Sequence, residues 1–157
     1  MSIERAKKHL AAWGRDKDVV EHDHSSATVE LAAEALGTEP CRIAKTLSFL
    51  NGERTILLVA AGDARVDSSA FKKRFGVKKV KMVPAEEVEA RTGHAVGGVC
   101  PFGVPEGVDV YLDESLRRFA TVHPACGSST SSIELTPEEL EEYSGALDWV
   151  DVCKDWR

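Results

Sequence analysis

The chain has 157 residues, 43% hydrophobic and 29% charged, and a net charge of −6 at pH 7. This composition is that of a globular protein rather than a disordered one, and no apolar run reaches the roughly 18 residues of a membrane span. The acidic balance argues against a protein coated in positive charge for nucleic acid. The amino-terminal residues lack the apolar core of a secretory signal. We therefore expect a cytoplasmic protein with neither a membrane nor DNA as a partner.

The first third of the chain predicts two helices. Apolar residues at helical spacing indicate a helix over residues 2–13. A second helix is expected over 29–36, because Ser25 or Ser26 can cap its start and Gly37 can end it. These two helices flank a polar segment in which no regular element is expected beyond a short strand.

Two apolar strands follow, over 43–50 and 54–61, and the Asn51-Gly52 pair between them is a hairpin signal. The second strand is almost wholly apolar, so we expect both of its faces to be buried. Shorter elements are expected elsewhere: strands at 19–20, 80–82, 108–112, 120–123, 132–135 and 149–152, helices at 67–75, 85–91 and 137–143, and a helical turn at 114–118. The irregular order predicts a single α+β (mixed α/β) domain around a hydrophobic central sheet.

The cysteines and histidines lack the spacing of metal ligands. None of the four cysteines forms a CxxC pair, so neither a zinc ribbon nor a thioredoxin-type site is expected. In a reducing compartment they are free thiols, and a disulfide between Cys100 and Cys126 is the alternative. We expect neither a metal nor another cofactor.

Lys45 is the most informative single residue. It lies in CRIAKTLSFL, where the strand period places it on the same face as Ile43, Leu47 and Phe49. If that face is buried, the ammonium needs a partner or a ligand, because an unpaired buried charge is costly. The alternative is that Lys45 reaches solvent from the end of the strand, or that the register differs.

Residues 93–104, GHAVGGVCPFGV, hold four of the twelve glycines of the chain. The segment has neither the GxGxxG order nor the GK[ST] ending of nucleotide-binding loops. Gly97 to Pro101 form a G-x-x-x-P pattern with Gly98 beside it, which can hold successive N–H groups toward an anion or a developing oxyanion. The alternative is a purely structural bend between strands. Cys100 with His94 or His123 would form a nucleophile–base pair only if the fold joined them.

Residues 72–81, KKRFGVKKVK, carry six cations and no anion. Such a strip can hold a phosphate backbone even on an acidic protein. Lys72, Lys73 and Lys78 are the residues we expect to contact nucleic acid. The alternative is a solvated helix end.

The order of several motifs resembles the YbaK family, bacterial aminoacyl-tRNA deacylases related to the editing domain of prolyl-tRNA synthetases. The motifs that carry this resemblance span roughly residues 20–153: SSATVELAAEALG, RIAKTLSF, ILLVAAGDARVD, FGVKKVKM, TGHAVGGVCPFG and IELTPEEL. The resemblance implies a single domain over 1–157, with an amino-terminal helix region over 1–19 and a core over 20–153. It also implies a mixed, partly barrel-like sheet surrounded by helices, with a pocket for the 3′ end of a mischarged tRNA.

The resemblance assigns roles to particular residues. Lys45 stands at the substrate pocket, where it engages the phosphate of the terminal nucleotide. The loop Gly97–Pro101, with Gly98, lies against the aminoacyl ester, and its Val99 and Cys100 count among the substrate-binding residues. No protein nucleophile or metal is implied, because backbone donors hold the ester carbonyl and the terminal ribose hydroxyl of the tRNA assists water.

The chain departs from the cysteinyl-tRNA-editing members at HPACGSSTSS, where they carry a basic, glycine-rich turn. Here Gly127 and Ser128 belong to a polar, uncharged loop that is expected to border the amino-acid pocket. His123 either donates a hydrogen bond to the substrate, as in alanine-editing relatives, or faces outward from its strand. The identity of the accepted amino acid is therefore open.

The leading hypothesis is a free-standing hydrolase that removes an amino acid from mischarged tRNA, with tRNA(Pro) as the expected substrate. Aminoacyl-tRNA is then the partner, and a prolyl-tRNA synthetase is a second candidate partner. The alternative is a non-catalytic module that binds tRNA or a synthetase and needs the basic strip but not Lys45. A thiol enzyme that uses Cys100 is a weaker alternative.

Overall fold

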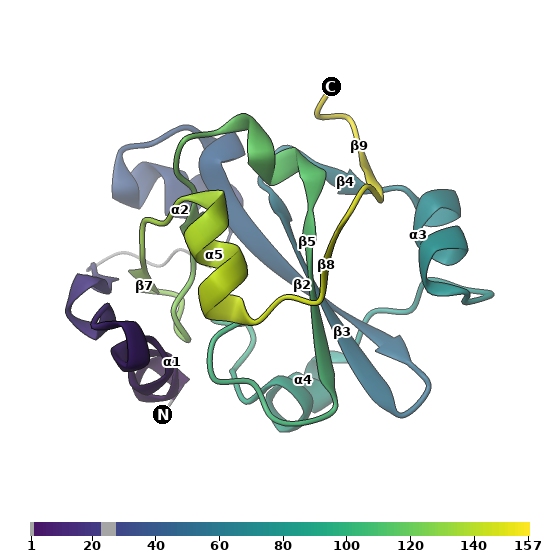
Figure 1. Cartoon of the computed structure of the whole chain (residues 1–157), viewed down its shortest axis with the longest axis horizontal. Coiled ribbons are helices and arrows are strands. Elements are labelled where there is room, and N and C mark those ends of the chain that lie inside the picture. Colours follow the sequence, from purple (N-terminus) through teal and green to yellow (C-terminus); the bar gives the residue numbers. More distant parts are fainter. Residues whose placement is uncertain (1, 23–27) are drawn as a thin grey trace.

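A hairpin of two long strands forms the centre of the computed structural model, which describes residues 2–22 and 28–157 (Figure 1). Strands β2 (Ile43–Asn51) and β3 (Arg54–Ala61) pair antiparallel in the register Asn51↔Arg54. The two-residue turn between them begins at Gly52, whose φ of +63° is readily adopted only by glycine. The hairpin expected from the sequence is confirmed, and β3 is buried on both faces except at Arg54.

Shorter strands extend the hairpin into a five-stranded mixed sheet with the order β6-β2-β3-β5-β8. Strands β5 (Val108–Asp113) and β8 (Asp148–Val150) add parallel on one side, and β6 (His123–Pro124) adds parallel to the start of β2 on the other. The sheet curls into a half-barrel (Figure 1). Two small antiparallel sheets complete the strands: β1 (Val20–Glu21) with β7 (Ser131–Ser132), and β4 (Arg65–Val66) with β9 (Cys153–Lys154).

Helices surround this sheet (Figure 1). The described residues form α1 (Ser2–Leu10), α2 (Val29–Leu36), α3 (Ser68–Phe75), α4 (Ala85–Thr92) and α5 (Pro137–Ser144). Short 3-10 turns are η1 (Ala11–Trp13), η2 (Asp16–Asp18), η3 (Pro40–Arg42) and η4 (Glu114–Arg118). No helix of the described part is long and apolar enough to cross a membrane. The predicted α+β class, with a partly barrel-like mixed sheet, is confirmed.

The two faces of the hairpin support different parts of the molecule. Side chains paired across an antiparallel ladder point to the same face, so Phe49 and Ile56 share one face, on which Phe49 packs against Phe71 of α3 with ring centroids 4.7 Å apart. The main apolar core contains both faces of β3 together with buried residues of α1, η4 and α5. A smaller cluster joins Ile43 to two alanines of α2.

Several local expectations need correction. Thr28 caps α2, because its side chain accepts the Leu31 N–H; Ser25 and Ser26 lie outside the described residues. The strand expected at 120–123 is instead β6 with a single bridge at Val122, and the one expected at 132–135 is β7 with a bridge at Leu135. The segment 80–82 makes only a bridge at Met82. The predicted lengths of these three strands are wrong because pairing with distant strands, not local propensity, determines where each strand begins and ends.

Candidate active site

A pocket of about 450 Å³ lies along the first half of β2. Its walls come from α2, the start of α4, the glycine-rich segment before β5, and the strands β6 and β7. Lys45, Gly97, Val99 and His123, all expected from the sequence as site residues, line this one pocket. The fold therefore joins the lysine motif to the glycine loop, although more than fifty residues separate them in the chain.

The pocket opens onto a stretch of β2 whose outer edge carries no partner strand among the described residues. Strand β6 covers this edge only at Ile43 and Ala44. Beyond it, the Leu50 N–H donates to the Lys81 carbonyl over 2.8 Å, and Ser48 O accepts the Val83 N–H over 3.0 Å. Because alternate residues of a strand direct their N–H and C=O groups to the same side, the peptide groups of Thr46 face the uncovered interval. A ligand in the pocket can pair with them.

The side chain of Thr46 strengthens this reading. Its Oγ1 is buried yet has no hydrogen-bond partner among the described residues, and Thr46 lines the pocket. A buried hydroxyl without a partner costs about 1–3 kcal/mol, so such groups in a pocket wall indicate a site for a polar ligand atom. Thr46 was not predicted as a site residue from the sequence. The sequence does contain a signal for it, because the position of the Asn51-Gly52 hairpin determines which residues of β2 direct their peptide groups to the outer edge.

Lys45 lines the pocket and is half-buried. Its Nζ donates to the carbonyl oxygens of Gly62, over 3.3 Å, and of Ala64. Burial lowers the pKa of this ammonium, and the nearby Cys153 and Asp63 oppose that effect. The half-buried cation thus has carbonyl acceptors, and it shares its strand face with buried Ile43 and Phe49 and with half-buried Leu47. The alternative in which it merely extends to solvent is wrong.

Glycine is required at positions 97 and 98 of the loop for two different reasons. The Gly98 N–H donates to the Ala95 carbonyl over 3.0 Å, which closes a tight turn with Gly97 at φ +92°; a turn of type II needs glycine at that position. Gly98 packs against Gly127 and Ser128, since a Cβ on it would lie 2.6 Å from their backbone atoms. The close approach expected from the sequence therefore comes from the chain itself at Gly98. Its N–H is already used within the turn, so it is not an oxyanion donor.

His123 lines the pocket from β6 and is half-buried. Burial lowers its pKa, Glu134 opposes this effect, and Arg42 adds to it. Arg42 and Thr121 hold Glu134 behind the histidine: the Thr121 hydroxyl donates to Glu134 Oε2 over 2.6 Å. A neutral imidazole at pH 7 can donate or accept a hydrogen bond inside the pocket. The alternative in which His123 faces away from the pocket is wrong.

Cys100 is fully buried behind the loop and does not line the pocket. The fold does bring its Sγ to 3.4 Å from His94 Nε2. That same nitrogen lies 2.7 Å from the Phe102 carbonyl, so it carries the proton of that bond and cannot accept one from the thiol. Burial raises the pKa of Cys100 to about 12. Cys100 is thus no thiolate nucleophile, and all four cysteines are free, so the disulfide alternative is wrong.

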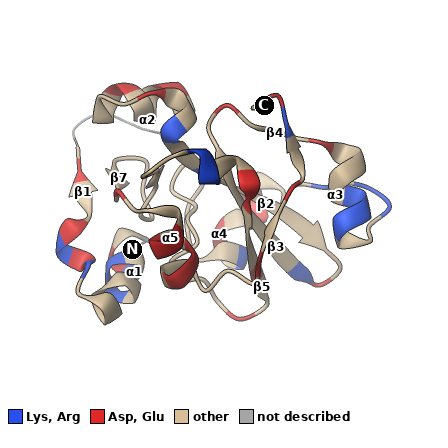
Figure 2. Ribbon diagram, turned by 45° about the horizontal axis from the view of Figure 1, so that its top comes forward, with Lys and Arg blue, Asp and Glu red and all other residues tan. Residues whose placement is uncertain are grey.

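The remaining expected residues lie outside the pocket wall. Pro101 is buried at the end of the glycine loop. Gly127 and Ser128 support Gly98 and do not line the pocket, whereas Ser131 and Ser132 of β7, a few residues on, do line it. The cations of the strip 72–81 lie on α3 and the segment after it (Figure 2). That segment ends at Met82 in the pocket wall, so the strip approaches the pocket.

The described residues contain no group of three or more histidine, cysteine or carboxylate side chains that could hold a metal ion. The described pocket wall offers an ammonium, an imidazole, hydroxyls and peptide groups. Together they suit a ligand with anionic or carbonyl oxygen atoms and an apolar portion.

Comparison with known proteins identifies the class. Residues 23–143 match the family model of the aminoacyl-tRNA editing domain. The chain belongs to this family, as the resemblance in the sequence predicted.

Individual relatives agree with this assignment. YwhH of Bacillus subtilis (strain 168) is 53% identical over 157 residues, 99% of each chain. A protein of Enterococcus faecalis (strain ATCC 700802 / V583) named "Putative Cys-tRNA(Pro)/Cys-tRNA(Cys) deacylase EbsC" is 34% identical over 136 residues, which cover 85% of this chain and 77% of that one. A crystal structure titled as "a putative trans-editing enzyme for prolyl tRNA synthetase" superposes with a TM-score of 0.87 at 32% identity, over 98% of this chain and 97% of the other.

Proposed function

We propose that this protein is a trans-editing deacylase that hydrolyses the ester of mischarged tRNA, with tRNA(Pro) as the substrate, in the cytoplasm. The observation that carries the proposal is the meeting of Lys45, Thr46 and Gly97 in one pocket of a chain from the aminoacyl-tRNA editing family. The choice of tRNA(Pro) rests on the name of the Enterococcus faecalis relative, which mentions Cys-tRNA(Pro) beside Cys-tRNA(Cys). It rests also on the structure described as a trans-editing enzyme for prolyl tRNA synthetase, and that synthetase is the proposed protein partner.

In this proposal the 3′ end of the tRNA enters over Met82 and the aminoacyl group lies beside β2. The ammonium of Lys45 attracts the phosphate of the terminal nucleotide. Peptide groups of the uncovered β2 edge and of Gly97 or Val99 bind the ester carbonyl, in keeping with their position in the wall. No thiol or metal takes part.

The chemical step needs only water as a co-reactant. Water adds to the ester carbonyl, and the terminal ribose hydroxyl of the substrate assists its deprotonation. The bond between carbonyl carbon and ribose oxygen then breaks, and that oxygen takes up the proton. The products are a free amino acid and uncharged tRNA.

The basic strip supplies the affinity for the tRNA backbone. Lys73, Lys78, Lys79 and Lys81 are exposed, and they lead from α3 toward Met82. A single-stranded 3′ end in the pocket leaves its duplex on this side, where the cations contact phosphates.

A deacylation panel tests the proposal: the purified protein against tRNA(Pro) charged with Ala, Cys, Ser, Thr or Pro. We expect hydrolysis of at least one mischarged tRNA, and its loss by at least a hundredfold in Lys45→Ala. Lys17→Ala is the matched control, because Lys17 is an exposed lysine of η2 outside the pocket. Hydrolysis at the wild-type rate by Lys45→Ala would contradict the mechanism; binding of tRNA without any hydrolysis would favour a non-catalytic module.

A further inference from the structure

The ammonium of Lys45 rests on a single tight turn of the backbone. Both of its acceptors, the carbonyls of Gly62 and Ala64, belong to the turn that links β3 to β4, which the Ala64 N–H closes by donating to Ala61 O over 3.0 Å. The position of the ammonium therefore depends on the position of this turn. None of residues 61–64 lines the pocket.

The turn is held from outside by Arg118. Its guanidinium forms two bonds to the Asp63 carboxylate, Nη1 to Oδ2 over 3.0 Å and Nη2 to Oδ1 over 2.5 Å. Such a two-point pair determines the orientation of both groups as well as their separation. The Ser115 hydroxyl adds a further anchor by accepting the Ala61 N–H over 3.1 Å.

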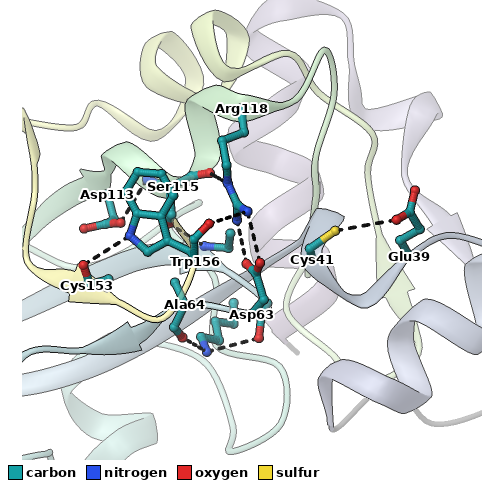
Figure 3. A network of polar contacts seen from close by, with 12 residues as sticks. Glu39, Cys41, Asp63, Ala64, Asp113, Ser115, Arg118, Cys153 and Trp156 are labelled. Atoms are coloured by element: carbon teal, nitrogen blue, oxygen red, sulfur yellow. Dashed lines mark hydrogen bonds and ion pairs between the residues drawn. The ribbon is translucent and has the colours of Figure 1, made fainter.

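The carboxy-terminal end of the chain in turn holds Arg118. The Trp156 carbonyl accepts its Nη1–H over 3.1 Å, and the guanidinium lies 5.0 Å from the centre of the Trp156 ring, within the range of a cation–π contact. Figure 3 shows Arg118 between Asp63 and Trp156, with Ala64 close to Asp63. Trp156 is itself tied to Cys153 O through its indole N–H over 3.1 Å.

The same terminal segment also pairs with β4, the strand that directly follows the turn. Strand β9 forms the register Arg65↔Lys154 and Val66↔Cys153 with β4, which begins one residue after Ala64. The match to the editing-domain model ends at residue 143. Part of the support for the turn, from β9 and Trp156, thus comes from beyond the matched region.

We propose that residues 153–157 position the Lys45 ammonium, through the chain of contacts from Trp156 to Arg118 to Asp63. In this role Asp63, Arg118 and Trp156 are positioning residues, which touch neither the pocket nor the substrate. The inference rests on the proposed function for its effect on catalysis, but not for its effect on the lysine itself. The negative charge of Asp63 also acts on Lys45, since it raises the lysine pKa against the effect of burial.

The test compares Arg118→Gln and Trp156→Ala with Arg54→Gln. Arg54 is the matched control because it forms an equivalent two-point pair with Asp109, over 2.8 and 2.6 Å, at the opposite end of β3. The first readout is the rate at which acetic anhydride acetylates the Lys45 amine of the folded protein. Mass spectrometry measures the acetylated fraction at Lys45. The second is the split of single-turnover deacylation into a rate constant and a half-saturating tRNA concentration.

We expect Lys45 to be acetylated several-fold faster in Arg118→Gln and Trp156→Ala than in wild type and Arg54→Gln. The single-turnover rate constant should fall about tenfold, because small displacements of a group that positions the substrate are costly. The half-saturating tRNA concentration should change less than twofold. Trp156→Phe, which keeps a ring over Arg118, should restore most of the rate.

Unchanged acetylation of Lys45 in both variants would overturn the inference, whatever the deacylation assay shows. If wild type hydrolyses no charged tRNA, the proposed function fails, and the acetylation rates still decide whether the segment positions the lysine. A variant with a lowered melting temperature is assayed at a temperature below its unfolding transition. The inference requires faster acetylation of Lys45 in both Arg118→Gln and Trp156→Ala.

Discussion

Gly98 lies directly against Ser128, so closely that a Cβ atom on residue 98 would stand 2.6 Å from the Ser128 Cα. This contact joins the glycine loop to the loop after β6. Gly97 and Val99 of the glycine loop line the pocket, and so do Ser131 and Ser132 of β7, which follows the second loop. Their contact therefore holds together two segments that lead into the pocket wall.

Gly98→Ala should move the two loops apart. Backbone atoms cannot yield as a flexible side chain does, so we expect a loss of about 1–3 kcal/mol in the free energy of unfolding and a fall in deacylation. Urea unfolding and single-turnover kinetics measure the two effects. Gly107→Ala is the control: it has a φ of +91° but open space around its Cβ, so it should cost stability without changing the activity. Equal activity of wild type and Gly98→Ala would show that the loop contact is irrelevant to the pocket.

Thr46→Val should separate binding from stability. The change removes the unpartnered hydroxyl at nearly constant shape, so the free energy of unfolding should stay constant or rise by about 1 kcal/mol. If the hydroxyl binds substrate, single-turnover deacylation should fall about tenfold. Thr38→Val is a close control, because Thr38 Oγ1 is likewise buried without a partner among the described residues but lies outside the pocket. A Thr46→Val protein as active as Thr38→Val would remove Thr46 from the site.

Stability should decline as the pH falls below about 6.5. Burial lowers the pKa of both His94 and His123 in the folded protein. In the unfolded chain these imidazoles take up protons near pH 6.5, so below that pH the unfolded state binds more protons and the free energy of unfolding decreases. Urea titrations between pH 7.5 and 5 measure the slope, which should be shallower in His123→Gln. An identical slope in wild type and His123→Gln would contradict the assignment of this effect to His123.

Charge reversal of the basic strip should weaken tRNA binding without altering the chemical step. The triple variant Lys72→Glu, Lys73→Glu and Lys78→Glu should raise the Kd for tRNA at least tenfold and flatten its dependence on salt. At saturating tRNA the single-turnover rate constant should stay within twofold of wild type. Lys8→Glu with Lys17→Glu is the control, because these exposed lysines lie on α1 and η2. Unaltered Kd and salt dependence would leave the strip as a solvated helix end.

Features with a local or periodic cause could be predicted from the sequence. The period of two placed Lys45 with Leu47 and Phe49, and the Asn51-Gly52 turn placed the hairpin, because both depend on neighbouring residues alone. Gly37 ends α2 at a φ of +66° for the same reason. These features define the central hairpin of the sheet and the wall of the pocket that β2 and α2 form.

What the sequence could not predict depends on contacts between distant segments. Strands β4 and β9 are two residues each and lie almost ninety residues apart, so neither has a pattern of its own. The partner of Gly98 and the carbonyl acceptors of Lys45 likewise come from elsewhere in the chain. Cys100 and His94 show the converse: the fold brings them together, but burial of the thiol and the bond of His94 to Phe102 remove the nucleophile–base chemistry.

The uncovered interval of β2 also bears on how the protein behaves in a crowded solution. An exposed strand edge is ordinarily a template for pairing with other chains, and proteins protect such edges. Within the described part of the chain, β6 at one end and the 81–83 segment at the other leave the peptide groups around Thr46 uncovered. That length is too short to recruit a foreign strand, yet sufficient for a small ligand. The protein can therefore present backbone donors and acceptors for recognition without inviting aggregation.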